Sequence, residues 1–382
     1  SKYYMRVKAM SSTSNESKWV YYKDGSSFKT KAEQIFNNVE ATDLFEDHVN
    51  LSWTPGADVT HITYANTNDA ENIQTINLTD EEKAAGKYTL GGLNPTSTYT
   101  ITIYKNDVKR GQLQVTTPAA MPAANFKYSL ASDVTVISQD LIDEIAEKAK
   151  AAAGNETNYS ATIGIPAGAK VALYGINDSD GGKTNVTIPD GMSVTFFGLA
   201  GGDAPTINLD KNFDIAGSHA FIKFQNVKLE ENGAGYFINQ SKACTVSEFT
   251  LENCEVSNLK TSFFRLQGSD AKSIGKLTLK NSIFTKLCAG YGFIHVDAGS
   301  GAGHVDNVEI DGCTFNSICV TGKVFIFSKK TDMQDITIKN STFYNCNGSG
   351  QYFVDFNADT FGPNTFTIEN CIFGKSADEA TN

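Results

Sequence analysis

Alternating apolar and polar residues mark short β-strands in the first third of the chain. Residues 49–53, 61–65, 100–104 and 112–116 each place their apolar side chains on one face, which predicts half-buried strands. Residues 3–9 and 18–22 show two further strand patterns that end at 28–30. Two strands cannot bury a core alone. We therefore expect residues 1–43 to be the tail of a similar module, completed by upstream strands or packed onto the next module.

One segment has helical rather than strand periodicity, and it follows a Pro/Ala-rich joint at residues 118–122. Ser138 can cap this helix and Gly154 can end it. Its apolar stripe consists of Leu141, Ile142, Ile145 and Ala149. We expect it to be the chain's only helix, within a linker and capping segment at 119–160, and to cover the open end of the next domain.

The C-terminal half repeats one unit six times, at 224–229, 251–256, 279–284, 310–315, 338–343 and 368–373. Its third position is Asn226, Asn253, Asn281, Gly312, Asn340 and Asn370, so successive units lie 27 to 31 residues apart. Asn and Gly suit a left-handed turn, and stacked Asn amides can hydrogen-bond between turns. Each unit is therefore predicted to be one coil of a solenoid, with the Asn residues forming an internal ladder.

A second strand pattern recurs in each coil, at 236–239, 263–266, 293–296, 325–327 and 353–356. Two or three short strands per coil without intervening helices indicate a parallel β-helix rather than a leucine-rich or β/α solenoid. The aligned phenylalanines of this strand are predicted to belong to the core. They are Phe237, Phe263, Phe293, Phe325 and Phe353.

Two family resemblances follow from these residues. Trp53 and the stretch from Leu93 through Pro95 to Tyr99 resemble a fibronectin type III domain, in which a tryptophan fills the sandwich and a tyrosine corner ties a loop to a strand. The repeats, together with Ile165-Pro-Ala-Gly168 and Ile188-Pro-Asp-Gly191, resemble the pectate-lyase-like superfamily. The expected fold class is all-β: a fibronectin-III-like β-sandwich at 44–118, then a right-handed parallel β-helix at 161–382 with an N-terminal capping helix.

This combination of modules is similar to outer-surface lipoproteins of gut Bacteroidetes that are encoded beside polysaccharide importers. The resemblance implies a lipid-anchored protein on the extracellular face of the outer membrane, with the periplasm as the less favoured location. It also implies a polysaccharide or oligosaccharide ligand and importer components as partners. The fibronectin-like modules would act as spacers, with Trp19 and Trp53 in their cores.

Charge and hydropathy limit which classes of partner the protein can bind. The formal net charge of −11 argues against nucleic acid or an anionic membrane as a partner, because both need a basic face. No run approaches the about 18 apolar residues of a membrane span, and the start at Ser1 lacks a signal-peptide pattern. We expect an export signal upstream and a monomeric protein.

Seven cysteines lie in the C-terminal half, in an odd number and without a Cys-x-x-Cys pair. This pattern favours neither a zinc site nor a disulfide framework. Cys254, Cys313 and Cys371 share one position of the repeat, where a small apolar side chain is expected inside the coil. We expect the cysteines to be reduced.

Candidate chemistry gathers on the outer face of the second strand, where the superfamily places its substrate groove. The phenylalanine alignment predicts one outward column of Asn239, Arg265, His295, Phe327 and Asp355. A second column, two residues on, contains Ser241, Gln267, Asp297, Lys329 and Asn357. Neighbouring coils lie about 4.8 Å apart, so the charged members could share a patch of saccharide dimensions. An ordinary solvated polar face is the competing interpretation.

Aromatic side chains near this strand could cover the apolar faces of sugars. They are Tyr236, Tyr291, Tyr344 and Tyr352. Asn239, Gln267 and Asn357 could add hydrogen bonds, with Arg265 beside them. These residues predict a ligand-binding site.

The catalytic signatures are incomplete. A pectate-lyase-like reaction needs a base, of which Arg265 is the candidate, and calcium held by several carboxylates. Asp297 and Asp355 are two coils apart, roughly 10 Å, which is too far for one tight calcium shell. A polygalacturonase-type hydrolase would show Gly-His-Gly and Arg-x-Lys motifs. Gly303-His304-Val305 departs from the first and the second is missing, so His304 is expected to be a loop histidine.

A non-catalytic, surface-exposed glycan-binding protein is therefore the favoured interpretation. A polysaccharide lyase or glycoside hydrolase is the second, and a structural or adhesive stalk the third. No cofactor or metal is expected, except for Ca²⁺ if the protein is a lyase.

Overall fold

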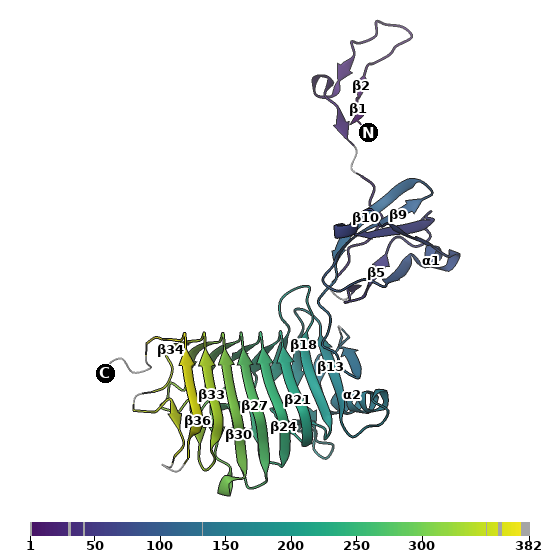
Figure 1. Cartoon of the computed structure of the whole chain (residues 1–382). Helices are drawn as coiled ribbons and strands as arrows, with labels where there is room; N and C mark the ends of the chain where they lie inside the picture. The colour runs from purple at the N-terminus through teal and green to yellow at the C-terminus, as the bar shows by residue number, and fades with distance from the viewer. Residues whose placement is uncertain are drawn as a thin grey trace. The chain divides into compact units, whose positions relative to one another are not determined.

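The chain divides into two compact units, Ser1–Pro118 and Ala119–Asn382 (Figure 1). Its structure is a computed structural model that describes residues 2–29, 32–40, 43–131, 133–348, 350–357 and 361–375. The last residues of the range expected to form the β-helix, 376–382, lie outside this description.

Two antiparallel sheets form most of the first unit. The larger has the order β10-β9-β6-β7, with bounds Val108–Thr116, Thr98–Lys105, His61–Asn66 and Gln74–Asn77. The smaller pairs β5 (His48–Ser52) with β8 (Lys87–Gly91). A 3₁₀ turn at Thr67–Asp69 links two strands of the larger sheet. The four strand patterns recognised between residues 49 and 116 thus all form strands.

Both sheets contribute to one hydrophobic cluster, because alternate residues of their strands face inward. Trp53 is 1% exposed within it, as expected, and packs edge-on against Phe36. The Tyr99 hydroxyl accepts a hydrogen bond of 2.8 Å from the backbone N–H of Asn94. This contact ties a loop to a strand as the Leu93-to-Tyr99 pattern predicts. The likeness to a fibronectin type III domain stays a prediction.

A short helix in this unit was not expected. Helix α1 spans Asp80–Ala85 and is fixed at its start by a capping box, in which Thr79 and Glu82 each bond the other's backbone N–H. Gly86 ends it with a left-handed φ of 65°. The prediction of a single helix was therefore wrong, because a six-residue helix is too short to show periodicity.

The strands expected near the N-terminus are shorter than predicted. β1 (Lys2–Tyr3) pairs with β4 (Phe28–Lys29), and β2 (Arg6–Val7) with β3 (Val20–Tyr21); a 3₁₀ turn follows at Tyr22–Gly25. Trp19 is 41% exposed, so its assignment to a core was wrong. The cationic groups of Arg6 and Lys8 lie 4.3 and 5.1 Å from its ring centre, which indicates cation–π contacts at the surface.

The second unit is a parallel β-solenoid, as the repeats predict. We call its first layer the long sheet. It contains β11 (Phe126–Ser129), β13 (Tyr159–Ile165), β18 (Met192–Gly198), β21 (Gly217–Gln225), β24 (Cys244–Glu252), β27 (Lys272–Lys280), β30 (Gly303–Asp311), β33 (Met333–Lys339) and β36 (Pro363–Glu369).

The corner sheet follows the long sheet in each coil. It contains β12 (Val136–Ile137), β14 (Lys170–Leu173), β19 (Thr206–Leu209), β22 (Lys228–Glu231), β25 (Glu255–Ser257), β28 (Ile283–Leu287), β31 (Thr314–Ile318), β34 (Thr342–Tyr344) and β37 (Ile372–Phe373).

The short sheet is the third layer and holds the second strand of the repeat. It contains β17 (Val186–Ile188), β20 (Phe213–Ile215), β23 (Tyr236–Gln240), β26 (Ser262–Leu266), β29 (Ile294–Val296), β32 (Ile326–Ser328) and β35 (Val354–Asp355). A small antiparallel pair, β15 (Gly175–Ile176) with β16 (Lys183–Thr184), lies outside the three layers, and a 3₁₀ turn spans Gly299–Gly301.

Stacked phenylalanines fill the interior. The predicted column from Phe237 to Phe353 is stacked, with neighbouring ring centres 4.6–5.5 Å apart. A second stack, Phe284, Phe315, Phe343 and Phe373, has spacings of 4.7–4.9 Å and meets the first edge-on. Aromatic rings favour both arrangements. The prediction that these phenylalanines belong to the core is confirmed for four of the five, which are fully buried, while Phe353 is half-buried.

The repeated Asn occupies a left-handed turn in every coil but does not form an internal ladder. The φ angles of the five Asn residues run from 48° to 58°, and Gly312 has 67°. Four of the five side chains are exposed, and Asn226 is half-buried. Hydrogen bonds link Asn253 to Asn226 at 3.2 Å and Asn370 to Asn340 at 3.3 Å. The ladder is thus external, because the corner turns the Asn side chain outward and points the next residue inward.

That next residue forms an interior column of Val227, Cys254, Ser282, Cys313, Ser341 and Cys371. Cys254 and Cys313 are each 1% exposed, and all seven cysteines are free thiols. The prediction that the cysteines are reduced stays a prediction. Hydrogen bonds offset the cost of burying the serine hydroxyls. Ser282 Oγ, for example, accepts from the Cys254 N–H at 3.0 Å and donates to the Lys280 carbonyl at 2.7 Å.

The second helix, α2 (Gln139–Ala152), packs against the first strands of the solenoid. Ser138 caps it through a 3.2 Å bond from the Leu141 N–H, as predicted, and Ile142, Ile145 and Ala149 join the solenoid core. Neither helix in the described part of the chain has the length and hydrophobicity needed to cross a bilayer.

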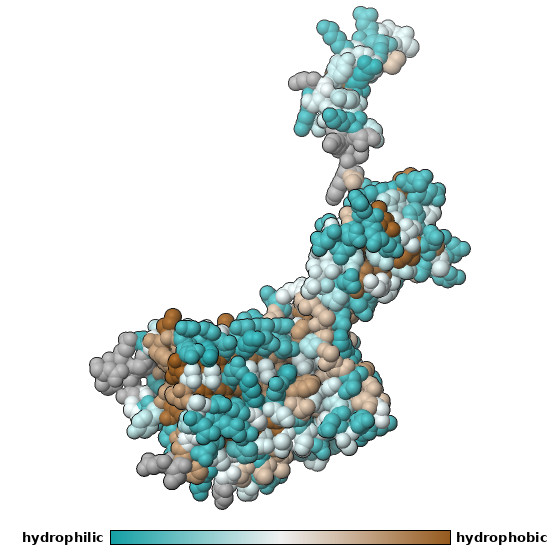
Figure 2. Space-filling model, viewed as in Figure 1, coloured by the Kyte–Doolittle hydropathy of each residue, from teal (hydrophilic) through white to brown (hydrophobic). Residues whose placement is uncertain are grey.

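At the other end, the residues of the last coil that match buried positions elsewhere are exposed. Phe366, Ile368 and Phe373 are 41–54% exposed. Hydrophobic surface at this end is visible on the left of Figure 2.

Candidate functional site

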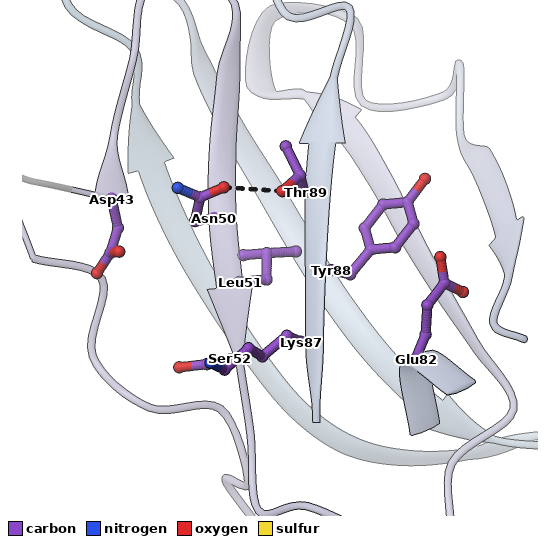
Figure 3. A pocket seen from close by; sticks show the side chains of 8 residues that line it. All are labelled: Asp43, Asn50, Leu51, Ser52, Glu82, Lys87, Tyr88 and Thr89. Carbon is purple, nitrogen blue, oxygen red and sulfur yellow. Dashed lines mark hydrogen bonds between the residues drawn. The ribbon is translucent and has the colours of Figure 1, made fainter. Parts of the chain in front are cut away.

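A depression of the first unit lies on its two-stranded sheet (Figure 3). It has a volume of about 650 Å³ and is lined by Asp43, Asn50, Leu51, Ser52, Glu82, Lys87, Tyr88 and Thr89. The Asn50 and Thr89 side chains bond each other at 2.8 Å. Burial, followed by the charge of Glu82, raises the pKa of Tyr88. These features describe an ordinary polar sheet face, and the depression has no convergent set of reactive groups.

The short sheet of the second unit carries the predicted outward column. Asn239 pairs with Arg265, Arg265 with His295, His295 with Phe327, and Phe327 with Asp355 in successive strands. Their neighbours on either side in each strand point into the core, since alternate residues of a strand face opposite ways. The alignment of these five residues in one column is confirmed.

Arg265, His295 and Asp297 form one group of interacting side chains. Arg265 donates from Nε and Nη2 to the two carboxylate oxygens of Asp297, at 3.2 and 2.6 Å. His295 Nε2 lies 3.7 Å from Asp297 Oδ2. The side chains of these three residues are 11%, 14% and 19% exposed. A two-pronged, largely buried pair of this kind holds its geometry better than a surface ion pair.

The backbone determines which nitrogen of His295 carries a proton. Nδ1 accepts a hydrogen bond of 3.2 Å from the N–H of Gly292. The neutral ring therefore carries its proton on Nε2, the nitrogen that faces Asp297. Contacts thus run without interruption from Gly292 through His295 and Asp297 to Arg265.

The pKa values follow from these contacts. Burial would raise the pKa of Asp297, but hydrogen bonds from His295 and Arg265 outweigh it and lower that pKa to about 2. Burial would likewise lower the pKa of Arg265, but the hydrogen bond and charge of Asp297 raise it. Both side chains are therefore firmly ionised at neutral pH.

Two aromatic rings, those of Tyr291 and Phe327, frame this group. The Arg265 guanidinium lies 3.7 Å from the ring centre of Tyr291. The His295 ring stacks on Phe327 at 4.6 Å and meets Tyr291 at 5.1 Å. Tyr291 sits between Gly290 and Gly292, and a β-carbon at Gly292 would come within 2.5 Å of the Val324 carbonyl oxygen. Glycine at this position is what allows the Tyr291 turn to pass close to the next coil.

A depression of about 570 Å³ runs along this face. It brings together six predicted residues, Tyr291, His295, Asp297, Lys329, Asp355 and Asn357. Its lining also includes Phe327, Lys323 and Gln351. Within the ranges that the structure describes, neither Lys323 nor Lys329 forms an ion pair, so both ammonium groups are available to a ligand.

The other predicted residues lie beside this depression or away from it. Arg265 does not line the depression but bonds Asp297, which does. Asn239, in the preceding coil, pairs with Arg265. Tyr236 begins strand β23 and Gln267 follows strand β26, and neither lines the depression. Tyr352 is 72% exposed in a loop. Tyr344 lies on the corner sheet, so it cannot share a ligand with the short sheet.

Sequence reasoning missed one extension of the column. Asp214 pairs with Thr187 and follows Phe213, which pairs with Ile238, so it lies one coil before Asn239. Burial raises the pKa of Asp214, and hydrogen bonds from Asn185 and Asn212 only partly oppose this. The alternation of apolar and polar residues in Phe213-Asp214-Ile215 could have revealed this position. It was missed because the alignment of the second strands began only at Phe237.

His304 is not a loop residue as predicted, because it lies in strand β30. Its Nδ1 contacts Asp306 Oδ1 at 2.7 Å, and Ser273 is its partner in the adjacent strand. Ser273 bonds Thr245 at 3.4 Å instead. A nucleophile must bond its base. Ser273, His304 and Asp306 therefore do not form a catalytic triad.

The carboxylates do not fit the calcium site of a lyase. Asp297 gives its oxygens to Arg265 and His295, and Asp355 is two coils away. Across the described ranges, no three His, Cys, Asp or Glu side chains are grouped so that they could hold a metal ion.

Comparisons with known proteins agree with the fold of the second unit. Residues 213–381 match a family model described as "Right handed beta helix region". No curated protein is similar enough to the chain to be matched to it. The matched segment contains the whole group around Arg265, His295 and Asp297, so the candidate site lies on a right-handed parallel β-helix.

Proposed function

We propose that the outer face of the short sheet binds a glycan without cleaving it. The observation that carries the proposal is the chain of polar contacts from Gly292 to Arg265, set beside the rings of Tyr291 and Phe327. The match to a β-helix family is compatible with glycan-related proteins. Planar polar groups next to aromatic faces are the elements that sugar recognition requires.

Preorganisation supports binding at this face. Arg265 and Asp297 hold each other, and His295 is fixed both by the Gly292 N–H and by stacking on Phe327. A ligand that meets side chains already in place loses less free energy to ordering them. The ammonium groups of Lys323 and Lys329 add donors to the same depression, and Asp355 adds an acceptor.

The protonation states argue against β-elimination. That reaction needs a base with a free lone pair near the substrate proton. Arg265 is ionised, since Asp297 raises its pKa. The free lone pair of His295 accepts the Gly292 N–H. Asp297, with a pKa of about 2, is a very weak base and is already bonded by both partners.

Carboxylate spacing argues against glycoside hydrolysis. Retaining enzymes need carboxyl groups about 5 Å apart and inverting enzymes about 6.5 to 9.5 Å apart, one of them with a raised pKa. Asp214 has a raised pKa, but three coils separate it from Asp297. By strand spacing that is about 14 Å. Asp355 is two coils from Asp297, about 10 Å by the same measure and at the upper limit of the inverting range. Asp297 has a pKa lowered to about 2, so it cannot be the protonated acid of such a pair.

The setting of this activity is also part of the proposal. We place the protein on the extracellular face of the outer membrane, lipid-anchored, with a polysaccharide importer as partner and the first unit as a fibronectin-like spacer. The support is the resemblance of the combined modules to Bacteroidetes surface lipoproteins. A structural stalk remains the competing function, and it predicts no saccharide ligand.

Affinity electrophoresis against a panel of plant and host polysaccharides tests the proposal, with product analysis of the same mixtures. We expect at least one polysaccharide to retard the protein while the mixture releases no oligosaccharide. Unsaturated, ultraviolet-absorbing products would establish a lyase instead, and saturated oligosaccharides a hydrolase. Unretarded migration across the whole panel would favour the stalk.

A further inference from the structure

A cluster of buried thiols lies directly beneath the loops of the candidate site. Cys288 and Cys319 are both fully buried, and Cys346 is close to both. Cys288 begins the segment that leads to Tyr291, and Cys319 begins the segment that leads to Lys323. These two segments line the depression on the short sheet.

Cys288 and Cys319 occupy the same position in consecutive coils. They directly follow the paired residues Leu287 and Ile318. The Cys288 N–H donates to the Leu259 carbonyl at 2.9 Å, and the Cys319 N–H donates to the Leu287 carbonyl at 3.0 Å. Both residues are left-handed, with φ of 69° and 57°, so their side chains leave the backbone in the same direction.

Their separation suits a disulfide bond. Consecutive coils are about 4.8 Å apart, and disulfides join Cα atoms about 4.4 to 6.8 Å apart. Burial, followed by the interaction with the Cys319 thiol, raises the pKa of Cys288, so the two thiols influence each other. Cys346 is offset, because the next residue, Asn347, donates its N–H to the Ile318 carbonyl and so occupies the position that matches Cys319.

We propose that Cys288 and Cys319 are an oxidisable pair, which a small-molecule disulfide such as oxidised glutathione converts into a bond between coils. One cysteine thiolate attacks the reagent, forming a mixed disulfide and releasing one glutathione thiol. The second cysteine attacks the mixed disulfide at the protein sulfur and releases the second thiol. Two protein thiols are oxidised, and one reagent disulfide is reduced to two thiols.

The bond joins the bases of the loops that carry Tyr291 and Lys323. Thr321 Oγ1 already links these loops through a 2.9 Å bond to the Ala289 carbonyl, so oxidation reinforces an existing contact. Burial raises the pKa of Cys288 well above its ordinary value, which keeps the thiolate fraction small. Oxidation is therefore slow, and it proceeds when the coil opens locally.

Oxidation of the native, full chain with excess oxidised glutathione tests the proposal. The protein is then unfolded, alkylated and mapped by mass spectrometry. We expect two of the seven cysteines to escape alkylation, with a cross-linked peptide that joins Cys288 to Cys319, and we expect the thermal midpoint to rise. The wild-type result decides the proposal without requiring a variant to fold.

Variants sharpen this result. Cys288→Ser and Cys319→Ser should each retain six alkylated cysteines after oxidation. The matched control is Cys254→Ser, at a buried cysteine whose neighbours in adjacent coils are Val227 and Ser282; it should still form the cross-link. Seven alkylated cysteines in the wild type after exhaustive oxidation would refute the proposal, and so would a cross-link that uses Cys346 in place of either partner. The outcome is independent of glycan binding.

Discussion

The long sheet and the short sheet enclose the same core but present different outer faces. On the long sheet, Lys and Glu pair across neighbouring coils, as in Lys223–Glu248, Lys276–Glu309 and Lys339–Glu369, with partly exposed side chains. On the short sheet, each coil contributes a different residue, from Asn239 through Arg265 and His295 to Asp355. The long sheet repeats the same kind of pair from coil to coil, which suits a structural role. The short sheet has a different outward residue in each coil, which is what a specific ligand site requires.

The two faces also differ in how strongly their charges are held. The Lys276–Glu309 pair has side chains 44% and 39% exposed, while those of Arg265 and Asp297 are 11% and 19% exposed. Exposed pairs contribute about 0 to 1 kcal/mol because water screens them. A charge that loses its partner in a buried pair costs several times more.

The largest effect is expected in the core that both faces share. Phe315→Ala removes a fully buried ring that stacks on Phe284 and Phe343. The free energy of unfolding of the solenoid unit should fall by about 3 to 5 kcal/mol. Phe366→Ala in the last coil, where the ring is 47% exposed, should cost about 1 kcal/mol or less. Urea denaturation of both variants measures the difference, and equal losses would contradict the packing described above.

The next largest loss of stability is expected for Asp297→Asn. It removes the charge that holds Arg265 and should lower the free energy of unfolding by about 2 to 3 kcal/mol. The wild type should show the same contribution in its pH dependence. Because the pKa of Asp297 is lowered in the folded state from 3.8 to about 2, its stabilisation is present above pH 3.8 and is lost as the pH falls towards 2.

Urea titrations across this acid range compare the wild type with Asp297→Asn. The two stabilities should converge as the pH approaches 2. A gap that stays constant would mean that the carboxylate of Asp297 does not provide the stabilisation.

A smaller effect is expected at the corner between the long sheet and the corner sheet. Asn281 has a φ of 48° and an exposed side chain. Asn281→Ala should cost about 1 kcal/mol, because alanine tolerates the left-handed conformation less well. Asn281→Gly should be close to neutral. If both variants lose the same stability, the Asn side chain rather than its backbone conformation is what matters.

The smallest effect is expected on the long sheet. Lys276→Ala breaks the pair with Glu309 and should change the free energy of unfolding by less than about 1 kcal/mol. Added salt should reduce even this difference. A loss as large as that of Asp297→Asn would remove the distinction between the two faces.

Much of the solenoid could be predicted because its physics repeats. Units 27 to 31 residues apart show the corner Asn five times, with Gly312 in the sixth unit, and the inward phenylalanine of the second strand five times. The outward column from Asn239 to Asp355 therefore follows by counting. The ladder was placed inside wrongly, because spacing shows that the Asn residues stack but not on which side of the corner they point. Helix α1 and the exposed Trp19 were missed because each depends on a few local contacts that do not repeat.

The candidate site was predictable only as a set of positions. Sequence spacing placed Arg265, His295 and Asp297 near one another, but not the bidentate pair or the backbone bond from Gly292. Those contacts depend on side-chain rotamers and on the path of the Tyr291 loop, which have no periodic signature. Lys323 and Gln351 were missed for the same reason, since they reach the depression from loops.

The most direct test of the difference between the faces compares two double variants for binding to a polysaccharide that retards the wild type. Arg265→Ala with His295→Ala removes a cation and an imidazole from the short sheet. Lys276→Ala with His304→Ala removes the same kinds of group from the long sheet. With folding of both confirmed by circular dichroism, the first should weaken binding about tenfold or more, and the second should leave it unchanged, with oligosaccharide released by none of the proteins. Equal binding by both variants, or oligosaccharide release that only the short-sheet variant loses, would contradict the account.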